Sequence, residues 1–218
     1  MNTATITMHG LTTPEESVPF ARPARARRVE IVSDDEDAQL MLAYARGEMR
    51  AFETLYARHR GALYRYLTRQ ARDGEVANDL FQEVWSRVIV NRVRYEPRAK
   101  FRTFLFTLAH NCFIDHCRRT KARPAGMVVE DADAADLLPA AEESQPDSAL
   151  SREESSRRYR AALATLPAEQ RDVYLLHEES DLSLEEIGRV TGVGTETAKS
   201  RLRYAVAKLK AALSVAEA

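Results

Sequence analysis

Residues 110–117 hold four side chains of the kinds that bind zinc, namely His110, Cys112, His116 and Cys117. The surrounding pattern predicts a helix, in which successive residues are turned by about 100°. His110 and Cys117 then share one side of the helix, while Cys112 and His116 lie on the far side. Because the ligands of a zinc ion must surround one point, we expect no metal site here. Nothing elsewhere in the chain indicates a cofactor.

Paired carboxylates, the usual equipment of acid–base catalysis, also occur. Asp79 and Glu83 are four residues apart and therefore share one face of a predicted helix. Such a pair alone is more often part of a solvated surface. The chain also has no glycine-rich phosphate loop and no nucleophile elbow. We therefore expect a binding protein and not an enzyme.

The sharpest local pattern lies near the C-terminal end and suits nucleic acid better than catalysis. Ser183 and Glu186 have the spacing of a capping box, which begins a helix. Gly192 can adopt the left-handed backbone that ends such a helix, and Gly194 or Thr195 then begins the next. A short helix, a tight turn and a second helix form a helix-turn-helix, whose second helix enters the major groove of DNA.

The second of these helices has two different faces. Its apolar residues gather on one side by helical spacing, and they are Ala198, Leu202, Ala205, Val206 and Leu209. The opposite side carries Glu196, Thr197, Ser200, Arg203 and Tyr204, flanked by Lys199 and Arg201. This pattern predicts a helix that packs by one face and reads DNA by the other. An ordinary helical hairpin with a solvated charged face would share it.

A second stretch, residues 101–119, also combines two faces in one predicted helix. One face holds Phe106, His110, Phe113, Ile114 and Cys117. The other holds Asn111, Asp115, Arg118 and Arg119, whose polar groups suit base edges and phosphates. At its start lie Tyr95, Lys100, Phe101, Arg102 and Phe104, which suit unstacked bases of a single strand. An aromatic core helix with solvated arginines would give the same pattern.

These motifs sit in a chain whose spacing predicts an all-α protein. Leu, Ala, Arg and Glu dominate, with only 8 Gly and 8 Pro in 218 residues. Helical periodicity covers residues 34–121 and 151–218, so we expect two small helical domains, the second containing the helix-turn-helix. Residues 1–33 show no periodicity and predict a disordered tail. Residues 122–150 are rich in proline and acid and predict a flexible linker.

The net charge of −1 hides strong segregation along the chain. Residues 34–125 carry a net +5, whereas residues 126–156 carry −8. Such asymmetry hints at a polyanionic partner. The sequence contains no apolar run of about 18 residues, so we expect no membrane insertion. With two cysteines and no apolar leader, we expect a cytoplasmic protein.

Taken together, three stretches resemble the extracytoplasmic-function (ECF) type of RNA polymerase sigma factor. The letters NDLFQEVWSRV (78–88) are similar to the segment by which these factors grip the polymerase core. The letters FRTFLFTLAHNCFIDHCRR (101–119) are similar to the segment that melts the promoter and reads its minus-ten element. The letters LPAEQRDVYLLHEESDLSLEEIGRVTGVGTETAKSRL (166–202) are similar to the domain that binds the minus-thirty-five element.

The resemblance implies a role for each matching residue. Contacts with core polymerase fall on Asp79, Gln82, Glu83 and Trp85. Contacts with the minus-ten element fall on Asn91, Lys100, Phe101, Arg102, Phe104, Asn111, Asp115, Arg118 and Arg119. Contacts with the minus-thirty-five element fall on Thr195, Glu196, Thr197, Lys199, Ser200, Arg201, Arg203 and Tyr204.

The resemblance also implies partners: core RNA polymerase, double-stranded and melted promoter DNA, and an anti-sigma factor, with the acidic linker in the RNA path of the polymerase. One departure is Gly188, where the family often has Ala. Within a helix, this glycine is expected to lower stability by up to about 1 kcal/mol relative to alanine.

Two other interpretations share parts of the pattern. One is a sigma-like decoy that binds no DNA; the other is a plain repressor, which would leave residues 78–88 unexplained.

Overall fold

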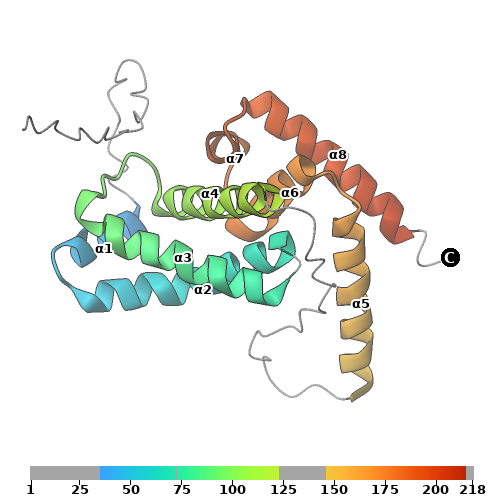
Figure 1. Cartoon of the computed structure of the whole chain (residues 1–218), viewed down its shortest axis with the longest axis horizontal. Helices are drawn as coiled ribbons and strands as arrows, with labels where there is room; N and C mark the ends of the chain where they lie inside the picture. The colour runs from blue at the N-terminus through green and yellow to red at the C-terminus, as the bar shows by residue number, and fades with distance from the viewer. Residues whose placement is uncertain (1–34, 72, 123–145, 215–218) are drawn as a thin grey trace, which may run out of the picture. The chain divides into compact units, whose positions relative to one another are not determined.

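Every regular element in the described part of the chain is helical (Figure 1). The computed structural model describes residues 35–71, 73–122 and 146–214. The tail expected over residues 1–33 and most of the linker expected over residues 122–150 lie outside the described residues. The all-α fold class predicted from the sequence is confirmed. Among the described helices, none is both long enough and apolar enough to cross a bilayer.

The N-terminal half contains α1 (Glu36–Ala45), α2 (Met49–Ala71), α3 (Gly74–Asn91) and α4 (Phe101–Ala122). A single turn of 3-10 helix, Arg92–Arg94, begins the loop between α3 and α4. The start of α3 is fixed by Asp73, whose side chain accepts hydrogen bonds from the backbone N–H groups of Glu75 and Val76. That cap satisfies two of the donors that the first turn of a helix leaves without partners.

Helix α2 forms the centre of this half, because α1, α3 and α4 all pack against it. Leu55, Leu63 and Leu67 of its apolar stripe are wholly buried, in the same core as Leu80 and Val84 of α3. Each such aliphatic side chain contributes roughly 1.5–3 kcal/mol by leaving water. The helical periodicity predicted over residues 34–121 thus corresponds to four helices in the described residues, and α3 and α4 both pack along α2.

The C-terminal half contains α5 (Pro146–Ala164), α6 (Ala168–Ser180), α7 (Leu184–Thr191) and α8 (Thr195–Ser214). The predicted capping box is present, since Ser183 accepts from the Glu186 backbone and the Glu186 side chain accepts from the Ser183 backbone. Gly192 has φ of 70° and ends α7 as expected. Helix α5 begins inside the range that the sequence assigned to the linker.

The two halves also contact each other, which the sequence did not predict. Helix α6 packs on α2, and α7 packs on α4. The described helices of both halves accordingly form one compact unit. Two helices that the family resemblance assigns to separate promoter elements, α4 and α8, are thereby joined through α7, which packs on both.

Candidate polymerase and nucleic-acid interface

Helix α8 presents the two faces that its sequence predicts. Ala198, Ala205 and Leu209 are buried against the rest of the C-terminal half, and Leu202 and Val206 are partly buried. On the other side Thr195, Glu196, Thr197, Lys199, Arg203 and Tyr204 are exposed. Ser200 is partly buried at the edge between the two faces.

The charged side chains of α8 differ in how firmly they are held. Arg203 lies over the ring of Tyr204, 5.1 Å from its centroid. The ammonium of Lys199 is 4.0 Å from the Glu196 carboxylate, at the limit of an ion pair. Arg201 instead pairs with Glu169 at the start of α6. Arg203 and Lys199 are thus available to a partner, whereas Arg201 also ties α8 to α6.

The turn before α8 leaves no room for a side chain at Gly188. A β-carbon placed there would lie 2.8 Å from the carbonyl oxygen of Val193. Glycine lowers the helix propensity at this position, but it avoids a clash with the Val193 carbonyl that any larger residue would make. Avoiding that clash outweighs the lower propensity. Close packing of α7 on the turn is what sets the position of α8.

Helix α4 is exposed where the sequence predicts polar contacts. Asn111, Arg118 and Arg119 are exposed, and Asp115 is partly exposed. Of the opposite face, Phe106 and Phe113 are buried. The minus-ten residues divide into two groups, one at the start of α4 and one in its second half.

The group at the start of α4 is engaged by the C-terminal half. The Lys100 ammonium is 3.3 Å from a carboxylate oxygen of Glu186. The Arg102 guanidinium donates to the Asp181 carboxylate at 2.9 Å and to the Ser180 carbonyl at 3.2 Å. Both cations predicted to meet DNA at this end are paired with acidic or carbonyl oxygens of α6, of the turn that follows it and of α7.

Glu186 combines two roles at this contact. Burial acts to raise the pKa of its carboxyl group, but hydrogen bonds from Ser183 and the nearby Lys100 cation outweigh burial and hold the pKa below its usual range. The carboxylate is therefore charged at neutral pH. One of its oxygens accepts from the Ser183 N–H and caps α7, and the other lies next to the Lys100 ammonium.

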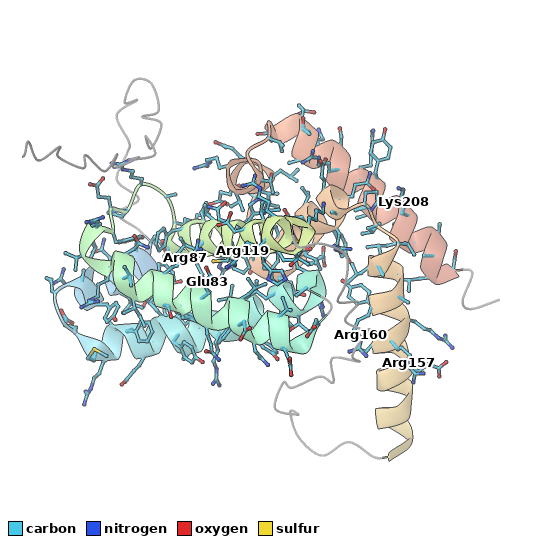
Figure 2. The ribbon with its side chains drawn as sticks, in the orientation of Figure 1. Glu83, Arg87, Arg119, Arg157, Arg160 and Lys208 are labelled. Carbon is cyan, nitrogen blue, oxygen red and sulfur yellow. The ribbon has the colours of Figure 1, made fainter. Side chains whose placement is uncertain are left out.

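The second group lies beside the residues assigned to core polymerase. Figure 2 shows Glu83, Arg87 and Arg119 close together between α3 and α4. A Glu83 oxygen is 2.5 Å from Arg87, and its other oxygen is 3.7 Å from Arg119. Asp115 lies 3.8 Å from Arg87 and extends the network. The surfaces that the sequence analysis assigned separately to core polymerase and to the minus-ten element thus share one set of ion pairs.

A groove of about 360 Å³ runs along this network, lined by residues that include Asp79, Glu83, His116 and Arg119. Asp79 and Gln82 are exposed at the surface of α3. Among the described residues no ion pair involves Asp79. These two side chains are the freest members of the predicted polymerase set.

Two predicted contact residues are buried. Trp85 is 5% exposed and packs against Phe52 and Tyr56, with ring centroids 5.7 and 5.0 Å away. Phe101 is fully buried, and its backbone N–H donates to Asp35. Neither ring reaches the surface in this structure, so each can support neighbouring contacts but not make them. Phe104 is partly buried, and its ring packs on Tyr95.

One exposed feature was missed in the sequence. Val90 and Val93 are 74% and 75% exposed, on either side of Asn91 and Arg92. Asn91 itself is partly buried and donates to the Arg87 carbonyl. The signal available was two valines, one in the last turn of α3 and one in the basic stretch that follows it. They place apolar surface next to the residues assigned to the minus-ten element.

Comparison with known proteins agrees with this geometry. Residues 55–123 match the model of sigma-70 region 2, and residues 156–209 match a model of sigma-70 region 4. The RNA polymerase sigma factor CarQ of Myxococcus xanthus is 33% identical over 78% of this chain and 94% of its own length. The ECF sigma factor SigM of Mycobacterium tuberculosis is 28% identical over 79% of this chain and 82% of its own length.

Solved structures share the fold. CnrH, determined in complex with the cytosolic domain of CnrY, matches with a TM-score of 0.61 and 24% identity, covering 82% of this chain and 97% of that one. The sigma factor RpoE of Bartonella quintana, determined with the anti-sigma factor NepR, matches with a TM-score of 0.60 and 21% identity, covering 75% and 97%. The chain therefore belongs to the sigma-70 family as an ECF-type sigma factor, a factor that binds core RNA polymerase and directs it to promoters.

Proposed function

We propose that the two halves divide this task between three surfaces. The exposed side of α3, with Asp79, Gln82 and the Glu83 network, docks on basic groups of core polymerase. The start of α4 and its exposed second half capture the minus-ten element. The exposed face of α8 enters the major groove at the minus-thirty-five element. We assign the first two surfaces to a domain of residues 34–121 and the third to a domain of residues 151–218.

The observation that carries this proposal is the separation of faces on α8. A helix that follows a tight glycine turn buries Ala198 and Ala205 while exposing Arg203 and Lys199. Arginine can donate two hydrogen bonds to a guanine edge, and lysine suits phosphate. A decoy without DNA-binding activity would not require cations on this face.

Sigma factors are initiation factors without enzymatic activity, and we propose that this one likewise leaves the chemistry to polymerase. It then acts in the cytoplasm, where polymerase and promoters are found. Two structural relatives were solved with CnrY and NepR bound. We propose a protein inhibitor of that kind, an anti-sigma factor, as the further partner of this chain.

The test is transcription from a library of promoters by core polymerase with and without the full-length chain. The expected result is a defined set of start sites that depends on both proteins, with shared sequence about ten and thirty-five base pairs upstream. Transcription that is the same without the chain would contradict the proposal. DNA binding by the chain alone, with no dependence on core, would favour a repressor instead.

A further inference from the structure

Asp35 occupies the position that normally caps helix α1, but its side chain is used elsewhere. It has an extended backbone directly before Glu36, and its carboxylate makes no capping hydrogen bond to α1. Oδ2 of Asp35 instead accepts from the backbone N–H of Phe101 at 2.6 Å. Phe101 is the first residue of α4 and lies 66 residues further along the chain. Asp35 therefore caps a helix to which it does not belong.

The start of α4 has no capping side chain of its own. Lys100 precedes the helix, and its side chain is a cation that cannot accept a hydrogen bond. The first turn of α4 also contains no acidic residue. The leading N–H groups of a helix have no partner within the helix, and a negative charge near them is favourable. The Asp35 carboxylate supplies both the acceptor and the charge.

Helix α1 also contacts the beginning of the loop that ends at α4. In Figure 1 α1 lies beside this loop, and it packs against both the 3-10 turn Arg92–Arg94 and α4 itself. The guanidinium carbon of Arg92 lies 5.7 Å from the centre of the Tyr44 ring, a cation–π arrangement. Tyr44 is buried and packs on Phe52 of α2. Helix α1 thus holds both ends of the loop, through Tyr44 at one end and Asp35 at the other.

Ion pairs with α2 keep the start of α1 in place. The Arg58 guanidinium donates to Glu36 at 3.0 Å and to Asp37 at 2.7 Å. The buried His59 has its Nε2 atom 2.7 Å from the other oxygen of Asp37. The His59 ring also packs on Phe101, with the ring centroids 5.3 Å apart. The beginning of α1 is therefore fixed close to the beginning of α4.

We propose that Asp35 is a positioning residue for reading the minus-ten element. The inference rests on the proposed function of the start of α4. Asp35 is partly buried and bonded to a backbone N–H, so its role is to hold the loop and not to contact DNA. A loop that is already ordered loses less freedom when it binds. Helix α1 precedes residues 55–123, which match sigma-70 region 2, so this role adds an element from outside that match.

The test uses holoenzyme reconstituted from core polymerase and the full-length factor. Asp35→Ala removes the acceptor, whereas Asp35→Asn keeps an amide oxygen that can accept from the Phe101 N–H. Glu53→Ala is the matched control, since Glu53 is an exposed acid of α2. The probes are two fluorescent single strands of equal length. One is copied from the minus-ten region of a promoter that the holoenzyme transcribes, and the other has the same bases in scrambled order. The readout is the ratio of the two affinities.

The ratio should fall about fivefold in Asp35→Ala and stay within about twofold of wild type in Asp35→Asn and Glu53→Ala, as expected from the typical strength of a helix cap. A role in stability alone would reduce the amount of active holoenzyme and leave the ratio unchanged. An unchanged ratio in Asp35→Ala would overturn the proposal. An equal fall in Asp35→Asn would also overturn it, since the effect would then belong to charge and not to the cap. If Asp35→Ala folds poorly, the ratio still decides, because only factor that has folded and bound core is measured.

Amide hydrogen exchange of the free factor tests the cap without DNA. Peptides that cover the start of α4 should exchange faster in Asp35→Ala than in wild type, while peptides from α8 should exchange alike in both. Unaltered exchange at the start of α4 would overturn the proposal. Failure of the proposed function would appear differently, because wild-type holoenzyme would then bind the two strands equally while the difference in exchange persisted.

Discussion

A β-carbon on Gly188 would lie 2.8 Å from the carbonyl oxygen of Val193. The same two residues are joined by a hydrogen bond of 2.9 Å from the Val193 N–H to the Gly188 carbonyl. Helix α7 and the turn that follows it are therefore in direct backbone contact. That turn connects α7 to α8 and so determines the orientation of α8. The orientation of α8 therefore depends on the absence of a side chain at position 188.

Gly188→Ala should destabilise the protein although alanine is the better helix former. The gain in helix propensity is up to about 1 kcal/mol, but overpacking that moves backbone typically costs about 1–3 kcal/mol. We expect a net loss of stability in denaturant unfolding. Gly194→Ala is the control, since a β-carbon there meets nothing within 4 Å. Equal unfolding midpoints for Gly188→Ala and wild type would mean that the turn adjusts freely.

Asp79→Lys should weaken binding to core polymerase without affecting the fold. Asp79 is exposed and makes no ion pair with any described residue, so the change removes no internal contact. Against a basic docking surface, a reversed charge should cost about 1–3 kcal/mol of affinity, measured by titration of labelled factor with core. Glu53→Lys, an exposed reversal on α2, should bind normally. If both variants bound like wild type, α3 would not be the docking helix.

Glu83→Lys tests binding to core polymerase less directly than the sequence alone suggests. The sequence predicts an exposed side chain whose replacement spares the fold. The Glu83 side chain is instead 33% exposed and pairs with Arg87 and Arg119. Reversing its charge would place three cations together. A loss of core binding in this variant would therefore mix docking with local rearrangement, and Asp79 is the better position.

The contribution of Glu186 to stability should depend on pH in the acid range. Its folded pKa lies below the usual value of 4.5. The unfolded chain therefore binds the proton more readily, and the stabilisation is complete above about pH 4.5 and lost as pH falls through the folded pKa. Glu186→Gln should cost about 1–2 kcal/mol at pH 7 and progressively less below about pH 4.5. Glu185→Gln, at an exposed position of the same turn that pairs with Arg189, is the matched control for removing a carboxylate. A cost that stayed constant from pH 7 to pH 3 would mean that the charge on Glu186 is not what stabilises this site.

Local patterns predicted the elements well because each rests on neighbours in sequence. The capping box at Ser183 and the left-handed Gly192 are properties of a few consecutive residues. The two faces of α8 follow from helical spacing, and burial of Ala198 and Ala205 matches it. Residues that the spacing placed on the outer face of α4, such as Asn111, are exposed.

Contacts between distant segments were not predictable in the same way. Trp85 and Phe101 belong to motifs that the family resemblance assigns to partner contacts, but which members of a motif reach the surface depends on packing against other helices. The contact between the halves did leave a signal. Asp172 and Glu179 share the stripe of α6 that carries Leu175 and Leu176, so two acids lie at buried positions. A carboxylate in an apolar stripe indicates a polar partner elsewhere, but spacing cannot name it.

Arg203→Ala and Lys199→Ala should separate base reading from phosphate contact on α8. Both side chains are exposed, and among the described residues Arg203 lies over the Tyr204 ring and Lys199 lies near Glu196 on the same helix. If Arg203 donates to a guanine, its loss should cost about 1–3 kcal/mol and relax specificity at that base pair. If Lys199 meets phosphate, its loss should weaken all promoters alike and lower the salt slope by about one.

The measurement for these two variants is transcription with core polymerase from promoters that carry single substitutions in the minus-thirty-five element, at several salt concentrations. Both variants should melt like wild type, because neither side chain packs in the core. If Arg203→Ala left the order and strength of every promoter unchanged, Arg203 would not be reading a base. A salt slope unaltered in Lys199→Ala would likewise remove the phosphate contact. If each variant instead lost activity only together with its fold, the exposed face of α8 would be supporting the structure and not the promoter.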